Sequence, residues 1–280
     1  MFVWLSSYPK SGNTLIRILL STYFFSNDGE LNFDLLKNIK QFPANDLFKN
    51  IGVDINNDEE IAKNYIKAQS SVNKINSIQF VKTHSSFRKM YDVNFTDTQN
   101  TLGCIYVVRD PRNVVTSYAH HFQLPIEEAC DKMISDNILS RTENTPPTYM
   151  GSWGYHYKSW KQLEKNQKYL LIRYEDLIKE KEKFFILILN FIGKISNTNI
   201  KIDLKKIKKV LENTDFKRLQ ELEKKSGFEE SVEDKKTGKK INFFNLGSEN
   251  KWENNLGIDI IKKIENEFQK EMIELGYLKS

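Results

Sequence analysis

The most constraining feature of the chain is a turn between an apolar run and a helical pattern at its amino end. The apolar run covers residues 2–5, the turn residues 6–14 (SSYPKSGNT), and the helical pattern starts at Leu15. A strand, a turn containing Gly12 and a helix start bring backbone N–H groups and the positive end of the helix dipole together, which favours a bound phosphate or sulfate. Lys10 adds a full positive charge, so we expect an anion-binding loop.

The order of residues in this turn differs from that in the loop of nucleoside triphosphatases. That loop reads G-x-x-x-x-G-K-[ST], whereas here Lys10 precedes Gly12 and no glycine comes earlier. The sequence therefore predicts a phosphate loop of another kind. The alternative is an ordinary strand-to-helix turn with a surface lysine.

A second segment with the same organisation makes the anion site the better interpretation. Residues 105–108 (IYVV) read as a buried parallel strand, and a helical pattern follows from Asn113. Asp110 and Pro111 between them are typical of an N-cap and a first helical residue. Arg109 leaves the strand end and Ser117 lies about two helical turns further on, so both could reach one phosphate group.

These two segments resemble the motifs of the sulfotransferase family that uses 3′-phosphoadenosine 5′-phosphosulfate (PAPS). Residues 8–14 resemble its 5′-phosphosulfate loop and residues 107–118 its 3′-phosphate motif. The resemblance extends from about residue 2 to about residue 256, in a short form like that of bacterial members. Shorter matches follow in the family's order: Lys82-Thr83-His84, Gly151-Ser152-Trp153, Tyr174-Glu175-Asp176-Leu177, Thr214-Asp215-Phe216-Lys217, and Phe243-Phe244-Asn245-Leu246-Gly247 ahead of Trp252.

The pattern of elements predicts an α/β fold with a doubly wound, mainly parallel sheet flanked by helices in a single domain; the resemblance implies a P-loop-like version of it. We expect strands at 2–5, 79–83, 105–108 and 169–172, helices at 15–25 and 113–122, and a polar helical region at 33–75. Ligands of such sheets bind outside the carboxyl ends of the strands. Lys10, His84, Arg109 and Tyr174 all lie at or just after such ends.

We expect a single domain, residues 1–280, in which three groups of segments bind the cofactor, form the acceptor pocket and close over the cofactor. The cofactor core would be residues 2–25, 79–122 and 168–193, and the acceptor pocket and lid residues 33–75 and 120–157. Residues 210–280 would close over the cofactor, with a charged stretch at 227–240 that is mobile without ligand. A final amphipathic helix at 258–277 would pack on the core through Ile258, Ile261, Ile264, Phe268, Met272 and Leu275.

Composition restricts the class of protein. A hydrophobic content of 39% without an 18-residue apolar run predicts no membrane-spanning helix, and a strand starting at Phe2 leaves no room for a signal peptide. Cys104 and Cys130 lack metal-ligand spacing and indicate reduced thiols in a cytoplasmic protein without a metal site. The net charge of +5 suits an anionic cofactor, and no recognition motif favours nucleic acid as a partner.

Sulfuryl transfer needs a base for the acceptor's proton and a cation for the leaving phosphate. His84 suits the first task because its unperturbed pKa of about 6.5 leaves it neutral near pH 7, and the resemblance implies the same role. Lys10 is the expected cation at the bridging oxygen, with Lys82 as a second. His120, His121 and His156 are interpreted as structural or acceptor-pocket residues.

The resemblance also implies which residues bind the cofactor. Ser11, Gly12, Asn13 and Thr14 would cradle the 5′-phosphate, and Arg109 and Ser117 would hold the 3′-phosphate. The adenine would lie against Tyr174 and Phe216, whereas Glu175 and Asp176 look structural. The full expected cofactor-binding set is Lys10, Ser11, Gly12, Asn13, Thr14, Arg109, Ser117, Tyr174, Thr214, Phe216 and Gly247.

Some positions depart from the family's pattern. Leu15 stands where the family often has an adenine-stacking Trp, and Asn245 and Leu246 replace an Arg-Lys pair at the 3′-phosphate. We hypothesise that Lys239 and Lys240, a few residues upstream, supply the missing charge. The family's dimerisation signature does not follow Trp252, which leaves the oligomeric state open.

The sequence thus predicts a PAPS-dependent sulfotransferase (EC 2.8.2) that forms 3′-phosphoadenosine 5′-phosphate (PAP) as its second product. Its acceptor would be a hydroxyl or amine on a small molecule, glycan or lipid. One alternative is a non-catalytic phosphoadenosine-binding protein, although Lys10, Lys82 and His84 argue for catalysis. A P-loop-type nucleotide kinase is disfavoured by the order of the loop residues.

Overall fold

Five parallel strands form the central sheet of the protein, in the order β2-β3-β1-β6-β9. The computed structural model describes residues 1–73, 77–137, 139–234 and 237–279. The strands of the sheet are β1 (Phe2–Ser7), β2 (Lys40–Gln41), β3 (Gln79–Thr83), β6 (Thr101–Val108) and β9 (Tyr169–Arg173). This arrangement confirms the predicted doubly wound, mainly parallel α/β fold.

Alternation along β1 separates the core into two layers. Phe2 and Trp4 point to one face of the sheet and Val3 and Leu5 to the other, as the period of two in a strand requires. Both sets are buried. A parallel sheet covered on both faces has strands that are apolar at successive positions, which is why the run at residues 2–5 lacks polar residues.

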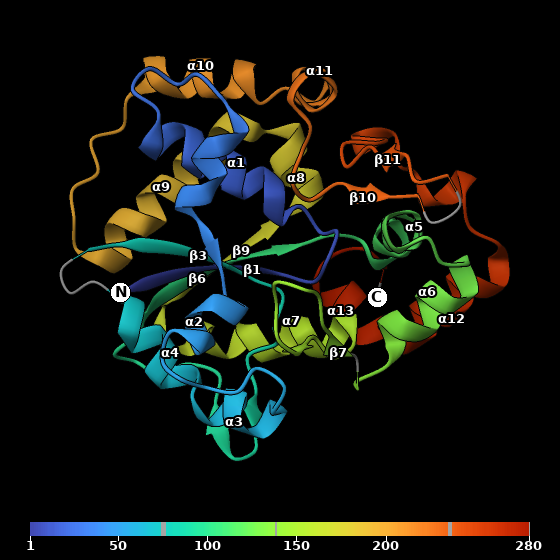
Figure 1. Ribbon diagram of the computed structural model, residues 1–280. Helices are drawn as coiled ribbons and strands as arrows, with labels where there is room; N and C mark the ends of the chain where they lie inside the picture. Colours follow the sequence, from blue (N-terminus) through green and yellow to red (C-terminus); the bar gives the residue numbers. More distant parts are fainter. Residues whose placement is uncertain (74–76, 138, 235–236, 280) are drawn as a thin grey trace.

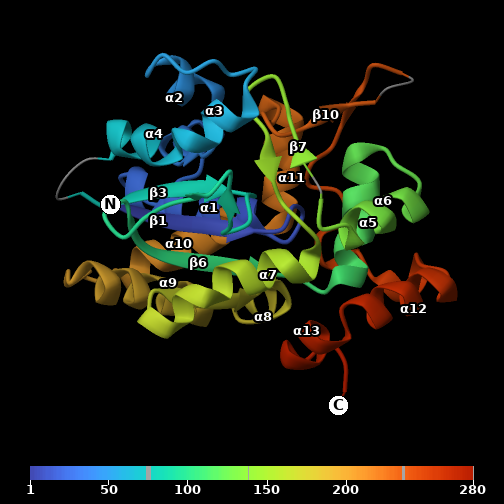
Figure 2. The ribbon, with the colours of Figure 1, turned by 90° about the horizontal axis from the view of Figure 1, so that it is seen from below.

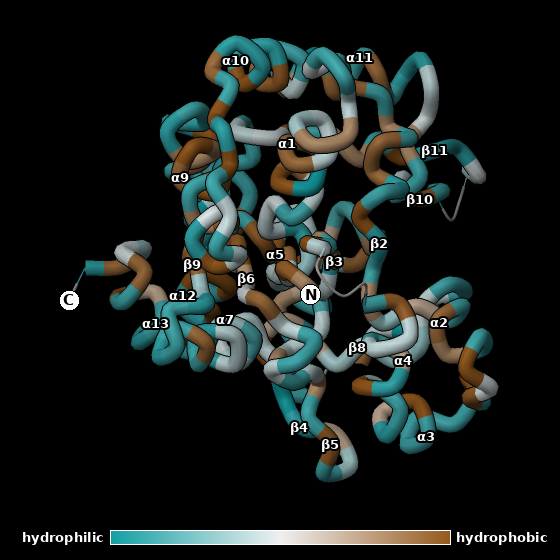
Figure 3. Tube along the Cα trace, turned by 90° about the vertical axis from the view of Figure 1, so that its left-hand side faces the viewer, coloured by the Kyte–Doolittle hydropathy of each residue, from teal (hydrophilic) through white to brown (hydrophobic). Residues whose placement is uncertain are grey.

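Helices cover both faces of the sheet (Figure 1). Above it in that view lie α1 (Asn13–Phe25), α8 (Tyr174–Lys179), α9 (Lys181–Ser196), α10 (Leu204–Asn213) and α11 (Phe216–Ser226). Below it lie α2 (Asn45–Lys49), α3 (Asp58–Lys63), α4 (Tyr65–Val72) and α7 (Trp153–Lys161). In Figure 3 the tube of α10 alternates between hydrophobic and hydrophilic residues, consistent with the burial of Ile207 and Val210 on one side of that helix.

A third group of helices lies beyond the end of the sheet (Figure 2). It consists of α5 (Pro111–Phe122), α6 (Ile126–Ile134), α12 (Ile258–Glu267) and α13 (Gln269–Glu274). Shorter 3₁₀ helices are η1 (Phe33–Asn38), η2 (Gln162–Asn166), η3 (Gly247–Glu249) and η4 (Trp252–Asn254). Within the described residues, antiparallel ribbons pair β4 (Lys89–Met90) with β5 (Val93–Asn94), β7 (Leu139–Ser140) with β8 (Thr148–Tyr149), and β10 (Val232–Glu233) with β11 (Lys240–Ile241).

The start of α5 follows the prediction and links the sheet to the C-terminal helices. Asp110 is the N-cap, its carboxylate accepts from the Arg112 N–H, and Pro111 is the first helical residue. The Arg112 guanidinium bonds both oxygens of Asp110, at 3.0 and 2.6 Å, and also Glu265 of α12 at 2.6 Å. The Glu175 carboxylate accepts from Asp110 N and from the Tyr277 hydroxyl. These buried bonds fix the chain just after β6.

Several boundaries differ from the sequence-based expectation. The strand predicted at 105–108 begins at Thr101, and the predicted helix at 15–25 begins at Asn13. The region at 33–75 contains β2 as well as helices, because its two strand residues pair with β3 without an apolar run of their own. The predicted helix at 258–277 is two helices that meet at Phe268, and its first residue, Ile258, is 61% exposed rather than packed on the core.

Candidate active site

Four of the predicted residues lie together at the carboxyl edge of the sheet. Lys10 follows β1, His84 follows β3, Arg109 follows β6, and Tyr174 follows β9. Because these strands are parallel neighbours, their ends meet at one edge. The edge is also where ligands bind in open α/β sheets.

The turn between β1 and α1 requires glycine at one position. Gly12 has φ +108°, a left-handed conformation at the N-cap of α1. A Cβ atom on Gly12 would lie 2.6 Å from Cδ2 of the Tyr174 ring. The absence of a side chain therefore lets Tyr174 pack directly against the loop, which also brings the end of β9 to the start of α1.

Replacing Gly12 by Ala is expected to destabilise the protein through two separate effects. The positive φ contributes about 1–3 kcal/mol, and overlap with Tyr174 adds about 1–3 kcal/mol. Gly52 is the matched control, because it has φ +78° and nothing within 4 Å of a built Cβ. Denaturant unfolding of both variants separates the two effects: Gly12→Ala should lose more stability than Gly52→Ala, and equal losses would contradict the Tyr174 contact.

Cationic and hydroxyl groups of the loop region converge on the carboxylate of Glu230. Thr14 Oγ1 donates to Glu230 Oε2 at 3.0 Å, and Lys82 Nζ lies 2.8 Å from Oε1. The Arg17 guanidinium, one turn further along α1, also bonds Oε1. Burial would raise the pKa of Glu230, but Lys82 and Arg17 outweigh this and hold the pKa well below its usual range. Glu230 is therefore ionised near pH 7, and the loop region holds a carboxylate of the chain itself.

Lys10 lies beside this carboxylate under an aromatic ring. Its Nζ is 3.9 Å from the centroid of the Phe243 ring, a cation–π contact. Burial lowers the pKa of Lys10 to about 8, with Glu230 acting to raise it and Lys82 and Arg109 to lower it. Burial also lowers the pKa of Lys82, against the attraction of Glu230. Lys10 is therefore a cation that can lose its proton at moderately alkaline pH.

The hydrogen bond of His84 fixes which of its ring nitrogens carries the proton. Nδ1 lies 2.8 Å from the Ser7 carbonyl oxygen, which can only accept. Nδ1 is therefore the N–H donor, and Nε2 of the neutral ring has a lone pair that can take a proton. Burial, and then Lys82, lowers the pKa of His84 to about 3, so the ring is neutral near pH 7.

A second histidine supports the first. His156 is fully buried, its Nε2 lies 3.1 Å from the His84 carbonyl oxygen, and its Nδ1 lies 2.8 Å from the Tyr106 hydroxyl. Since the carbonyl only accepts, Nε2 of His156 is the donor and Nδ1 accepts from Tyr106. His156 thus has a structural role, one of the two interpretations made from the sequence.

Arg109 connects the loop after β1 to the C-terminal segment. Its guanidinium donates to the Lys10 carbonyl at 3.5 Å and the Gly247 carbonyl at 3.3 Å, and lies 4.5 Å from the centre of the Tyr174 ring. Its Nε is buried without a partner among the described residues. Ser117 lies two turns along α5 and is partly exposed. The structure therefore leaves donor capacity on Arg109.

The predicted aromatic contact at Phe216 lies against the Gly247 backbone. A Cβ on Gly247 would come within 2.7 Å of the Phe216 ring, and φ at Gly247 is +54°. Phe216 is the first residue of α11. Thr214 is fully buried at the C-cap of α10, where its hydroxyl donates to the Val210 carbonyl at 2.8 Å.

Further loop residues after β1 carry buried polar atoms without a partner among the described residues: the Tyr8 hydroxyl, Ser11 Oγ and Asn13 Oδ1. Asn13 donates through its Nδ2 to the Leu5 carbonyl at 2.8 Å, which holds the loop on the end of β1. The first N–H groups of α1 have no acceptor within the helix, as at any helix start. The loop can therefore offer several additional hydrogen bonds to a ligand.

The hypothesised substitutes for the missing Arg-Lys pair lie on an exposed hairpin. Lys240 belongs to β11, which pairs with β10, and Lys239 precedes it; both are exposed. Leu246 is 45% exposed, and the Asn245 carbonyl accepts from Gln220 at 2.9 Å. Residues 235 and 236 of the charged stretch lie outside the described residues. The compensating role of Lys239 and Lys240 stays a prediction.

The sequence-based reasoning missed two residues of the site, Arg17 and Glu230. Arg17 could have been found, because it lies three residues after Thr14 and so on the same face of α1. Glu230 had no such signal, since it is 216 residues from Thr14 and stands in a stretch whose many charges look solvated.

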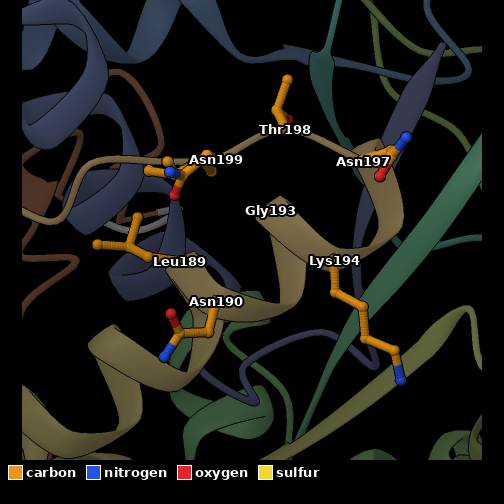
Figure 4. Close-up of a pocket in the computed structure, with 8 residues that line it drawn as sticks. Leu189, Asn190, Gly193, Lys194, Asn197, Thr198 and Asn199 are labelled. Atoms are coloured by element: carbon orange, nitrogen blue, oxygen red, sulfur yellow. The ribbon is translucent and has the colours of Figure 1, made fainter.

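Two hollows open on the surface of the described residues. One, of about 580 Å³, lies between α5 and the β10–β11 hairpin and is lined by Thr116, His120, Ile241 and Leu246 among others. The other, of about 590 Å³, is lined by Asn190, Lys194 and Thr198 at the end of α9 (Figure 4). Since Ile195 beside it packs on Gly103 near the start of β6, this second hollow lies at the opposite edge of the sheet.

The chain matches one described protein family over almost its whole length. The family model described as the sulfotransferase domain matches residues 2–276. Bovine sulfotransferase 1E1 is 23% identical over 169 residues, which are 60% of this chain and 54% of that protein. Flavonol 3-sulfotransferase of Flaveria bidentis is 26% identical over 167 residues, 58% of this chain and 52% of that protein. The chain thus spans about half the length of these curated relatives.

Solved structures show the same fold. Mouse sulfotransferase SULT7A1, complexed with PAP, has a TM-score of 0.60 at 18% identity, covering 96% of this chain and 83% of its own. Retinol dehydratase, in complex with androsterone and the inactive cofactor PAP, has a TM-score of 0.62 at 18% identity, covering 97% and 80%. Throughout the described ranges, no helix has the length and apolar character needed to cross a membrane.

Proposed function

Because the chain belongs to the sulfotransferase domain family, we propose that it transfers a sulfuryl group from PAPS to a small-molecule acceptor, releasing PAP. The observation that carries this proposal is the Glu230 carboxylate held by Thr14, Lys82 and Arg17. That carboxylate takes the hydrogen bonds and ion pairs that an anionic ligand would take at the same donors. The residues that bind it therefore fit a sulfate or phosphate ester.

The donor would supply an activated sulfur atom, and the rest of the chemistry would be done by the protein. Nε2 of His84 would accept the proton of an acceptor hydroxyl or amine as that atom attacks sulfur, and the bond of Nδ1 to the Ser7 carbonyl supports this role. Lys10 and Lys82 would stabilise the charge that develops on the leaving phosphate.

The remaining cofactor contacts are proposed from the positions of the side chains. Ser11, Asn13 and the first amides of α1 would bind the 5′-phosphate, and Arg109, with Ser117, the 3′-phosphate. The adenine would lie near Tyr174 and Phe216, the two rings that pack on the backbones of Gly12 and Gly247. Thr214 would act through the end of α10 rather than by contact.

The acceptor is proposed to be a small molecule with an apolar or aromatic body. The ring centroids of Tyr8 and Tyr118 lie 6.3 Å apart and those of Tyr118 and Phe122 4.4 Å apart. An aromatic cluster, buried at Tyr8 and Tyr118, therefore adjoins the loop. One relative is named for a flavonol. The pocket would be built from residues 33–75 and 120–157. The buried free thiols Cys104 and Cys130 support a cytoplasmic location.

Thermal stabilisation by PAP tests the proposed cofactor directly. At a PAP concentration of 100 times Kd, the native state should gain about 2.7 kcal/mol, whereas ATP with magnesium should stabilise less. The Arg109→Ala protein should lose most of the stabilisation by PAP. The control is Arg141→Ala, which removes an exposed arginine between β7 and β8 and should keep the stabilisation. Stronger stabilisation by ATP with magnesium would favour a nucleotide kinase instead.

A further inference from the structure

The ion pairs of Glu230 place a carboxylate of the chain itself at the loop that would bind the donor. Thr14, Lys82 and Arg17 each direct a donor to this one group, while Nη2 of Arg17 donates to the carbonyls of Leu36 and Ile39. The carboxylate side chain is 24% exposed, whereas those of Lys82 and Arg17 are 8% and 10% exposed. Two cations that are almost completely buried thus share one carboxylate from a distant segment, which balances one of their two charges.

The segment that carries Glu230 is held in place by α11. The Glu223 carboxylate of that helix accepts from the Ser231 hydroxyl at 2.6 Å, the Phe243 N–H at 2.6 Å and the Phe244 N–H at 3.0 Å. Phe228 is buried against Phe243 and Phe244, with ring centroids 5.0 and 5.2 Å away. We call residues 228–231, with Phe243 and Phe244, the Glu230 strap.

The strap covers both parts of the anion site at once. Glu230 pairs with both Lys82 and Arg17, while Phe243 lies over the ammonium group of Lys10. The Thr14 hydroxyl has one proton to donate, and here it goes to Glu230. A second anion could not receive that proton, and it would be repelled by the Glu230 charge at close range.

We propose that Glu230 is an internal competitor of the donor's phosphosulfate, so that PAPS binds only when the strap withdraws. The proposal rests on the proposed function for the identity of the ligand. Binding then selects the withdrawn state, and the apparent Kd exceeds the intrinsic Kd by the reciprocal of the withdrawn fraction. Glu230 therefore sets the donor affinity without contacting the donor.

The test compares PAP binding to the parent protein, Glu230→Gln and Glu229→Gln by calorimetric titration. Glutamine has nearly the same shape as glutamate but no charge, so Glu230→Gln should bind PAP about tenfold more tightly if the strap is withdrawn in about a tenth of the parent molecules. Glu229 is the matched control, since it is exposed on the same segment. Its variant should stay within about twofold of the parent. Unchanged or weaker binding by Glu230→Gln would overturn the proposal.

A second measurement keeps the proposal testable if Glu230→Gln folds poorly. In the parent protein, amide hydrogen exchange of residues 228–231 should become faster when PAP is added, because the strap loses its contacts with the loop. Slower or unchanged exchange in a protein that binds PAP would contradict withdrawal.

The outcomes separate this inference from the proposed function. Failure of the parent and of both variants to bind PAP would argue against the proposed cofactor. Inorganic pyrophosphate then serves as the probe, and Glu230→Gln should still bind it more tightly than the parent does. Equal affinity of the parent and Glu230→Gln for pyrophosphate would overturn the internal competition as well.

Discussion

The His84→Gln protein is expected to retain PAP binding and to lose a factor of about 10²–10⁴ in kcat, the usual contribution of a positioned general base. The physical reason is the tautomer fixed by the Ser7 carbonyl, which leaves Nε2 as the proton acceptor. Glutamine can keep a hydrogen bond to Ser7 but offers no basic nitrogen. The measurement is single-turnover transfer with saturating PAPS, next to PAP titration of the same protein.

A kcat within tenfold of the parent would show that another group takes the proton. The pH profile gives an independent check on His84. Because its pKa is lowered to about 3, the neutral form prevails above that value. No acidic limb from this residue should therefore appear between about pH 5 and pH 7.

Replacing Lys10 by Met is expected to lower kcat/KM by about 10²–10³, a loss like that of one preorganised group facing transition-state charge. Methionine fills similar volume under Phe243 but carries no charge to offer the leaving phosphate. Lys165→Met, at an exposed position in η2, is the matched control and should leave kcat/KM unchanged. Equal rates for Lys10→Met and the parent would remove Lys10 from the reaction.

The lowered pKa of Lys10 adds a prediction on pH with a definite sign. Lysine is charged below its pKa, and burial lowers the pKa of Lys10 to about 8, so kcat/KM of the parent should decline as the pH rises through about 8. In Lys10→Arg the group stays charged at all these pH values. The alkaline decline should therefore disappear in that variant, and its persistence would assign the decline to another group.

The positions of the site residues that directly follow β-strands could be predicted from the sequence. Lys10, His84, Arg109 and Tyr174 each follow a β-strand, and parallel neighbours must bring such residues to one edge. Gly12 belonged to the predicted loop for a similar reason, since it stands between a strand and a helix, and glycine adopts the left-handed conformation found there without steric cost. In these cases the information lies within a few residues of the chain.

Contacts between distant segments could not be predicted in this way. Glu230 reaches Thr14 and Lys82 because Phe228 is packed in the core and Ser231 is hydrogen-bonded to the Glu223 carboxylate. These contacts leave no periodic pattern in residues 227–240. Ile258 shows the reverse error. It continues the apolar spacing of α12 but lies at the first turn, beyond the core that the helix covers.

Sulfotransferase activity is tested most directly by transfer of ³⁵S from labelled PAPS, with the parent protein and with His84→Gln. Phenols, aliphatic alcohols, amines, sugars and lipid extracts would be offered as acceptors. We expect a labelled product from a small-molecule hydroxyl or amine with the parent protein, and we expect His84→Gln to form none. A parent protein that binds PAP tightly but labels no acceptor in any class would contradict catalysis and favour a phosphoadenosine-binding protein.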